Sequence, residues 1–258
     1  MAGIGVIADA HANLPATVAA LDALALCRCT TVVHVGDAIA IGPHPREVLE
    51  LLREREVVCL LGNHDAWFAF GLPSPPPGWL PGGVVEHEHW THAQLSAEQR
   101  EVVRAWPYEL EVRLGAKTVV FLHYARRPDG EFDYIAEPTA TDLDRLFASV
   151  DADLVVFGHD HRPFDLASGG RRFLSPGSLG CHDRAEARAF VLGEAPGGDV
   201  DVEWVVVPYD DTELLADFER RSVPERGAIL RTFITRPLGN PDDELADRLE
   251  PRVPRGVE

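Results

Sequence analysis

Val57-Val58-Cys59-Leu60-Leu61-Gly62-Asn63-His64-Asp65 is the stretch of the sequence that decides the fold. Its apolar first half predicts a buried strand, and Gly62 permits a tight turn where that strand ends. An open α/β sheet places its chemistry at the carboxyl ends of such strands. Taken alone, however, Asn, His and Asp after a strand more often form a turn and a helix cap than a catalytic site. The interpretation therefore depends on how the other strands end.

The sequence before this stretch alternates between predicted strands and predicted helices. Residues 3–8 and 31–35 are short apolar runs, which are typical of buried strands. Residues 14–26 and 46–55 carry apolar side chains at helical spacing. The order strand, helix, strand, helix, strand indicates a parallel sheet with right-handed crossovers.

Residues 66–108 do not continue the alternation of predicted strands and helices. A run rich in proline, 73–78, separates an aromatic segment from two predicted helices at 86–93 and 96–106. Ser96 and Gln99 have the spacing of a capping box. We interpret residues 66–108 as a helical cap inserted over the site; a surface excursion without a role in binding explains the sequence equally well.

The rest of the chain is predicted to complete one domain, residues 1–235. It contains predicted strands and helices, followed by a tail at 236–258 that is rich in proline and charge and is expected to be loosely ordered or to act as a partner-dependent arm. The expected strands are 109–114, 118–122, 153–157, 163–167, 171–174, 187–192 and 200–207, and the expected helices are 141–150, 212–221 and 226–234. The later, shorter strands favour a mostly antiparallel sheet.

The composition and charge of the chain restrict the classes of partner that it is expected to bind. The chain of 258 residues has a formal net charge of −18, which gives it no general attraction for nucleic acid or anionic lipid. No apolar run approaches the roughly 20 residues that span a bilayer. The apolar start lacks a basic region and is interpreted as the first strand, not a signal peptide. The cysteines show no CxxC spacing, so a reduced, cytoplasmic protein is the simple expectation.

Several apolar runs of the predicted core are followed directly by metal-ligating residue types. They are Asp9 and His11, Asp37, Asn63 and His64, His123, and finally His159 and His161. In a parallel sheet these loops open at one edge, so the side chains would converge on one crevice. Nitrogen and oxygen ligands without a thiolate suit Mn²⁺, Fe or Zn²⁺. The set is too large for one ion, and two ions about 3.5–4 Å apart would be equipped to hydrolyse a phosphate ester.

Each of these residues has a simpler explanation. Asp9 could cap the helix after it, Asp37 could be a turn residue, and Asp160 could bond its own loop. His34 lies inside a strand and is interpreted as a core histidine. The remaining histidines, His44, His87, His89 and His92, are expected on the surface or in the cap. A single strand-end site would favour these explanations, whereas the repetition at successive strand ends favours a metal site.

At this point the sequence resembles the calcineurin-like metallophosphoesterases, most closely their compact bacterial phosphodiesterase branch. The family pattern is D-x-H, G-D, G-N-H-D/E, a lone H and G-H-x-H. The matching segments here are Asp9-Ala10-His11, Gly36-Asp37, Gly62-Asn63-His64-Asp65, His123 and Gly158-His159-Asp160-His161. The resemblance spans roughly residues 4–192, and it implies a four-layer αββα sandwich of two packed sheets flanked by helices.

The resemblance also implies a role for each motif residue. Asp9, His11 and His161 would hold one metal ion, Asn63, His123 and His159 the other, and Asp37 would bridge them. His64 would stay free to protonate the leaving group, and Asp65 would orient it. Asn13 would contact the phosphate or hold the first loop, and Asn63 would also face the substrate. Independently of the resemblance, Arg162 lies in a loop beside the last ligands and could grip a phosphate, although simple solvent exposure is the favoured interpretation. Tyr124-Ala125 stands where the branch usually has Gly-Ser, which affects the substrate pocket.

The sequence therefore predicts a two-metal hydrolase of phosphate esters, in which a metal-bridging hydroxide attacks phosphorus and His64 protonates the leaving group. The expected ions are Mn²⁺ foremost, with Fe, Zn²⁺ or Ni²⁺ as alternatives. A phosphodiesterase or phosphomonoesterase acting on a small molecule, including a nucleotide, is the leading interpretation. A dinucleoside polyphosphate hydrolase, a protein phosphatase and a catalytically silent metal-binding scaffold are the alternatives; a nucleic-acid or membrane partner is not expected.

Overall fold

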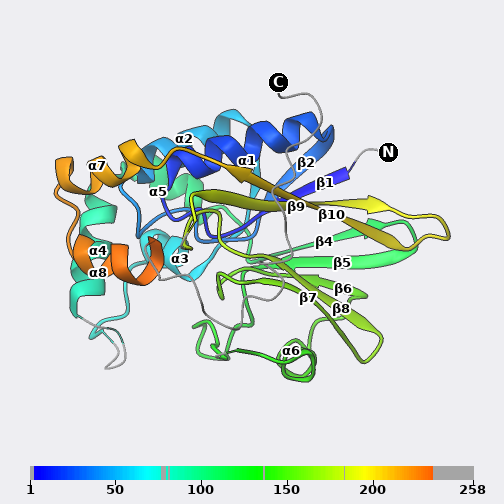
Figure 1. Cartoon of the computed structure of the whole chain (residues 1–258). Helices are drawn as coiled ribbons and strands as arrows, with labels where there is room; N and C mark the ends of the chain where they lie inside the picture. Colours follow the sequence, from blue (N-terminus) through cyan, green and yellow to red (C-terminus); the bar gives the residue numbers. More distant parts are fainter. Residues whose placement is uncertain (1–2, 77–79, 81, 136, 183, 235–258) are drawn as a thin grey trace.

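Two five-stranded sheets lie face to face in the computed structural model, which describes residues 3–76, 80, 82–135, 137–182 and 184–234 (Figure 1). The first sheet has the order β10-β9-β1-β2-β3, with β1 (Gly3–Ile7), β2 (Cys29–His34), β3 (Val58–Cys59), β9 (Glu186–Glu194) and β10 (Val200–Pro208). The second has the order β4-β5-β6-β8-β7, with β4 (Glu109–Leu114), β5 (Lys117–Leu122), β6 (Leu154–Val156), β7 (Pro163–Ser168) and β8 (Arg171–Pro176). The expectation of an α/β fold with two sheets is confirmed.

Both sheets are mixed. Strand β2 runs parallel to β1 and β3, as the sequence predicts, and β5, β6 and β8 are also parallel neighbours. The late strands, however, do not form an antiparallel sheet of their own: β9 and β10 extend the first sheet, whereas β7 and β8 extend the second. The reason lies in β9, where Phe190 faces the opposite sheet and Ala189 faces the helical layer. A strand that is apolar on both faces fits a place covered on both sides.

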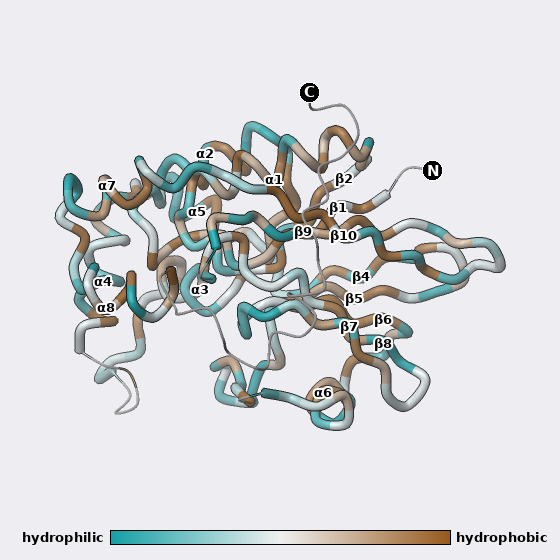
Figure 2. Tube along the Cα trace, viewed as in Figure 1, coloured by the Kyte–Doolittle hydropathy of each residue, from teal (hydrophilic) through white to brown (hydrophobic). Residues whose placement is uncertain are grey.

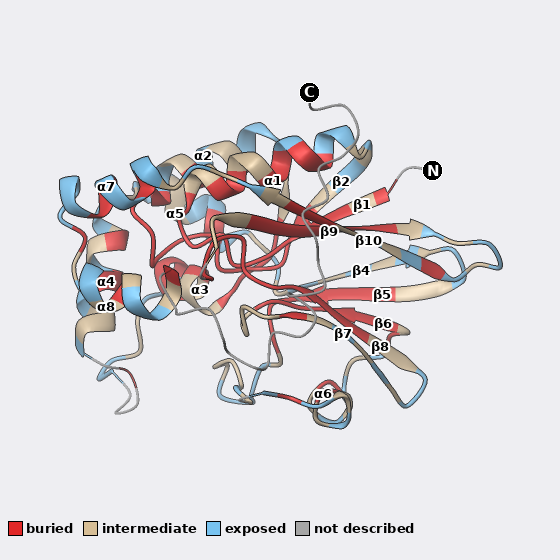
Figure 3. Cartoon of the chain, in the orientation of Figure 1, coloured by how far each residue is buried: buried red, intermediate tan, exposed pale blue. Residues whose placement is uncertain are grey.

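The core between the sheets is made mainly of valine, leucine and phenylalanine side chains. Val6 and Val33 from the first sheet meet Phe121 and Val156 from the second. These strand segments are the hydrophobic and buried parts of the molecule (Figures 2 and 3). The core is therefore continuous up to the strand ends, where the polar residues begin.

Helices cover the outer faces of both sheets. The first sheet packs against α1 (Leu14–Leu26), α2 (Pro45–Glu54), α3 (Asn63–Phe70) and α5 (Ala97–Arg104), and the second packs against α6 (Ala140–Leu146). Helix α3 is absent from the sequence expectations, because its first residues read as a turn. In the structure, Gly62 is its N-cap and the Asp65 carboxylate accepts the Gly62 N–H at 3.0 Å.

The helices of the segment expected as a cap, residues 66–108, pack in two different parts of the fold. The capping box of Ser96 and Gln99 opens α5 as predicted, but Val103 of α5 packs into the helical layer over the first sheet. Helix α4 (Gly82–Ala93) instead lies at the site end, beside the C-terminal α8 (Arg226–Ile229) and π-helical η1 (Leu230–Ile234) (Figure 1). Helix α7 (Thr212–Arg220) precedes them. The tail expected at 236–258 lies outside the described residues. Among the described residues, no helix has the length and apolarity to cross a membrane.

Candidate metal and catalytic site

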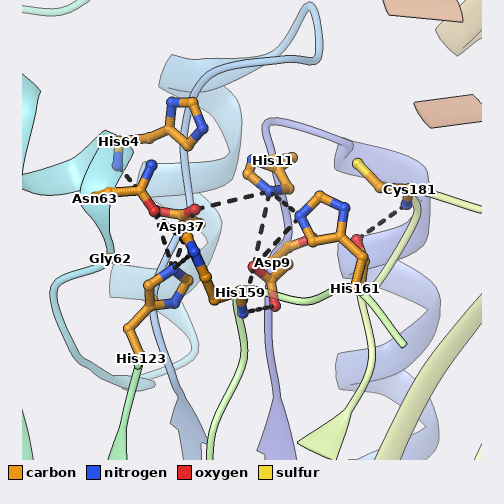
Figure 4. A network of polar contacts seen from close by, with 12 residues as sticks. Asp9, His11, Asp37, Gly62, Asn63, His64, His123, His159, His161 and Cys181 are labelled. Atoms are coloured by element: carbon orange, nitrogen blue, oxygen red, sulfur yellow. Dashed lines mark hydrogen bonds and ion pairs between the residues drawn. The ribbon is translucent and has the colours of Figure 1, made fainter. Parts of the chain in front are cut away.

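The candidate ligands converge where strands of both sheets end (Figure 4). Asp9 and His11 follow β1, Asp37 follows β2, and Asn63 opens α3 just after β3. From the second sheet, His123 follows β5 directly, and His159 and His161 follow β6. The structure thus brings together all the residues predicted as metal ligands, from strand ends that are distant in the sequence.

Three of these side chains form one side of the site. Nε2 of His11 lies 2.9 Å from Nε2 of His161 and 3.8 Å from Oδ1 of Asp9. Nε2 of His161 lies 3.6 Å from the same Asp9 oxygen. Asp9 and His11 are almost completely buried. Two imidazole nitrogens and a carboxylate oxygen within this range are a donor set for a divalent ion.

The other four side chains form the adjacent side. Oδ2 of Asp37 lies 3.2 Å from Nε2 of His123 and 3.9 Å from Nε2 of His11. Nδ1 of His159 lies 3.2 Å from the His123 nitrogen, and Oδ1 of Asn63 lies 3.1 Å from Nδ1 of His159. Asp37 therefore stands between the two groups, the position that a bridging carboxylate would need.

The backbone at the site adopts conformations that side-chain-bearing residues rarely take. Asp9, His11, Asp37, His159 and His161 have φ angles of 51°, 44°, 59°, 72° and 67°. Such left-handed positions cost of order 1 kcal/mol each and persist where the surrounding structure imposes them, often at functional sites. Here they turn the side chains of successive strand-end residues toward one point.

Hydrogen bonds to the backbone orient the imidazoles. The Nδ1–H of His123 donates to the Val35 carbonyl at 2.9 Å, so its Nε2 faces the site. Nδ1 of His11 contacts the Ile39 carbonyl at 3.4 Å, which leaves its Nε2 pointing inward in the same way. A ligating histidine commonly has its second nitrogen fixed by such a carbonyl.

Two of the candidate ligands, His11 and His159, have the neutral form that metal binding requires. Burial and the neighbouring His161 hold the pKa of His11 well below its usual range, and burial lowers the pKa of His159 to about 3. Both rings are therefore neutral and offer lone pairs. Burial lowers the pKa of His123 as well, but the Asp37 carboxylate outweighs it and raises that pKa to about 9. A cation bound at Asp37 would displace this proton.

The donor atoms around Asn63 are suited to binding a cation. Oδ1 of Asn63 faces Nδ1 of His159 and, at 3.3 Å, Nε2 of His123. An amide oxygen gains little from the unprotonated Nδ1 of His159, whereas a cation among these atoms would be ligated by all of them. Rotating the amide by 180° would offer N–H groups to the same neighbours.

The comparison with protein families agrees with this geometry. Residues 3–196 match the family model described as the calcineurin-like phosphoesterase superfamily domain. The chain belongs to the calcineurin-like phosphoesterase superfamily. The resemblance seen in the strand-end motifs is therefore confirmed, and the clustered His and Asp side chains are the superfamily member's candidate metal centre.

Individual relatives include proteins without an assigned role. The uncharacterized protein MJ0912 of Methanocaldococcus jannaschii is 26% identical over 176 residues, which cover 68% of this chain and 69% of that protein. The crystal structure of the hypothetical protein PH1004 from Pyrococcus horikoshii OT3 superposes with a TM-score of 0.76 at 20% identity, covering 92% of this chain and 99% of the other. A metallophosphoesterase from Sphaerobacter thermophilus gives a TM-score of 0.67 at 24% identity, covering 90% and 97%. These structures share the fold.

His64 of this calcineurin-like phosphoesterase lies beside the ligand cluster and pairs with a residue that the sequence analysis did not single out. Its Nδ1 contacts Oε1 of Glu88, a fully buried residue on α4. Its ring packs edge-on against His11 at 5.3 Å between centroids. Burial alone would lower the pKa of His64, but the Glu88 carboxylate outweighs it and raises that pKa to about 9. His64 is thus held protonated within reach of the metal site.

Asp65 has contacts other than those expected. Instead of orienting His64, its carboxylate accepts the N–H of Asp37 at 2.7 Å and that of Ala38 at 3.1 Å, besides the N–H of Gly62. Asp65 thereby fixes the loop that presents Asp37. The contact with the His64 ring is made instead by Glu88, because α4 packs against α3.

The residues expected to contact substrate are engaged within the protein. Oδ1 of Asn13 accepts the Ala16 N–H at 3.1 Å as the cap of α1, and its Nδ2 donates to the Tyr209 hydroxyl at 3.0 Å. This matches the alternative in which Asn13 holds the first loop. The Arg162 guanidinium pairs with Asp160 at 2.6 Å. Asn63 is the one of these three whose side chain faces the ligand cluster.

Two further side chains lie at the site, and no sequence pattern predicted them there. Glu88 stands in the run Glu86-His87-Glu88-His89, where nothing marks one acid as buried. Cys181 has its ligand atom within 4.8 Å of those of His11 and His161. Its surroundings in the sequence contain none of the strand-end motifs that marked the other ligand-type residues. His89 is exposed, and His87 and His92 lie on α4 within the segment expected as a cap, whereas His44, expected at the surface or in the cap, is buried; His34 is a core residue as predicted.

Proposed function

We propose that this protein is a two-metal hydrolase of phosphate esters, a phosphodiesterase or phosphomonoesterase. The observation that carries the proposal is the pair of adjacent donor groups with Asp37 between them. Membership of the superfamily supports it. In this proposal Asp9, His11 and His161 hold one ion, Asn63, His123 and His159 hold the other, and Asp37 bridges them.

The bound ions would supply the attacking nucleophile by lowering the pKa of a water, and would neutralise charge on the phosphoryl group. The protein's own contribution is proton delivery. His64 has Glu88 on Nδ1, so Nε2 is the nitrogen left to donate. As the bond from phosphorus to the leaving oxygen breaks, His64 gives its proton to that oxygen and is reprotonated from solvent.

Mn²⁺ is the ion we propose foremost, with Fe, Zn²⁺ and Ni²⁺ as alternatives, because the donors are imidazole, carboxylate and amide groups. The proposed setting is the cytoplasm and the proposed substrate is a small phosphate ester. The catalytically silent scaffold is less favoured, because no motif position has lost its donor and His64 is present.

Hydrolysis of bis-p-nitrophenyl phosphate by the Mn²⁺-loaded protein tests the proposal. Chelation should abolish turnover, and Asp37→Ala should lower kcat at least about a hundredfold, because the ions lose their shared ligand. His64→Ala should retain metal and lose turnover mainly for esters with poor leaving groups. Turnover that survives both chelation and Asp37→Ala would refute the mechanism.

A further inference from the structure

A pocket of about 520 Å³ adjoins His64 and has no role in the proposed reaction so far. It lies between α3, α4, α8 and η1. Most of its lining is apolar, from Ile41, Trp67, Leu80, Val84, Ile229 and Phe233. The volume is within the range of small-molecule sites, which are typically apolar with a few polar groups at one end.

The pocket meets the metal site at two points. His64 belongs to the pocket wall and its ring contacts that of His11. Phe233 belongs to the wall as well, and its ring centroid lies 5.8 Å from that of His161. A molecule in this pocket would therefore have one end at the position of the phosphoryl group, on the side where His64 delivers its proton.

The charge of the pocket restricts what it can accept. Its described lining contains Glu88 and Glu225 but no lysine or arginine. Glu88 is already paired with His64, and Nε2 of His87 accepts the Ile41 N–H at 2.7 Å. An anionic group entering the pocket would meet apolar side chains and Glu225, and the positive charge of His64 is already balanced by Glu88, so the pocket disfavours a further buried negative charge.

We propose that this pocket binds the leaving group of the substrate, and that the leaving group is an uncharged, largely apolar alcohol, aryl or branched alkyl. The inference rests on the proposed hydrolysis of phosphate esters. It assigns substrate selectivity to α4 and the C-terminal helices. It also disfavours dinucleoside polyphosphates, since a nucleotide leaving group would bring further phosphates into the pocket.

Two methyl phosphate diesters test the inference, one with 1-naphthol and one with 4-hydroxybenzenesulfonate as leaving group, because these alcohols have similar acidity but differ in charge. With the full, Mn²⁺-loaded chain, kcat/KM should be at least about tenfold higher for the naphthyl ester. Val84→Phe should raise KM for the naphthyl ester several-fold by filling the pocket. The neighbouring Val85→Phe, outside the lining, is the matched control and should leave both esters unaffected.

Product inhibition by 1-naphthol, but not by 4-hydroxybenzenesulfonate, gives a measurement on the unmodified chain that does not depend on the folding of a variant. Equal kcat/KM for the two esters, with equal inhibition by the two alcohols, would overturn the role of the pocket and leave the proposed function standing. Failure to hydrolyse either ester, and bis-p-nitrophenyl phosphate as well, would overturn the proposed function itself.

Discussion

Glu88 is the residue that connects the helical insertion to the candidate chemistry. Its side chain is fully buried, contacts Nδ1 of His64 and lies 3.4 Å from Nε2 of His92. A buried carboxylate in contact with Nδ1 of His64 holds the proton and the orientation of that imidazole. Glu88 is therefore a positioning residue, which acts through His64.

Replacing Glu88 by Gln should change the pH dependence of turnover. The Glu88 carboxylate raises the pKa of His64, to about 9, so its removal should lower that pKa. A general acid must be protonated, and kcat falls as the pH rises through its pKa. The alkaline limb of the kcat profile should thus move to lower pH in Glu88→Gln. An alkaline limb that coincides with that of the exposed Glu86→Gln control would contradict the positioning role.

Gly62 is required by the approach of Asp37. A Cβ at position 62 would lie 2.1 Å from Oδ1 of Asp37, so Gly62→Ala must displace the proposed bridging carboxylate. We expect Mn²⁺ affinity to fall at least about tenfold, as measured by isothermal titration calorimetry. Gly82→Ala is the matched control, because nothing lies within 4 Å of its added Cβ. Equal Mn²⁺ affinity in the two variants would show that the site tolerates this displacement.

The residue motifs were predictable because they require only a strand, a turn and a donor. The contacts of Asp65 and Glu88 were not, since the tetrapeptide gives the identity of Asp65 but not the neighbouring loop that its carboxylate fixes. Glu88 faces His64 only once α4 has packed against α3. Sequence patterns record periodicity within an element, whereas such pairs depend on the arrangement of several elements.

At the scale of elements, the C-terminal helices α7 and α8 pack against the loops of the site and hold them in place. Nε2 of His44, just before α2, lies 2.7 Å from Oδ2 of Asp217 on α7. Ile41 and Cys181 pack with Phe218 and Ile229 in one apolar cluster. These helices were predictable from their apolar spacing, but their packing against the site was not, because the partner loops are distant in the sequence.

Asp217→Ala should destabilise the protein by about 1–3 kcal/mol at pH 7, because it leaves His44 buried without its partner. Burial alone would raise the pKa of Asp217, but the bond to His44 lowers it below the ordinary value. The stabilisation is thus present above the ordinary aspartate pKa of about 4 and is lost as the pH falls through the lowered pKa.

Urea unfolding at several pH values measures this difference, with the exposed Glu213→Ala on the same helix as control. The control should change the free energy of unfolding by less than about 1 kcal/mol. A stabilising interaction between His44 and Asp217 would be contradicted by either of two results. In the first, Asp217→Ala lowers the free energy of unfolding at pH 7 no more than the control does; in the second, its effect grows as the pH falls below about 4.

At the scale of the whole molecule, the proposed ions would join the two sheets. Asp9, Asp37 and Asn63 come from the first sheet's connections, and His123 and His159 from those of the second. The sequence predicted this convergence through the parallel strand order. It did not predict that β9 and β10 would complete the first sheet, because strand pairing at long range depends on which faces are covered.

Metal binding should therefore stabilise the fold. Saturation at a hundredfold excess over Kd contributes roughly 2.7 kcal/mol per site when only the folded state binds. We expect the Tm of the metal-free protein to rise by several degrees with Mn²⁺ and to fall again with chelator. His159→Ala should lose much of this rise. A Tm that is independent of Mn²⁺ would indicate that the ligands are not a binding site in the folded protein.

The central claim, a phosphoesterase that uses two ions, is tested most directly by titrating Mn²⁺ into the metal-free protein while following hydrolysis of bis-p-nitrophenyl phosphate. We expect activity to appear mainly with the second equivalent of Mn²⁺ per chain and then to saturate, and we expect Asp37→Asn to remove this step. Full activity at one equivalent, or the same activity without metal, would contradict it.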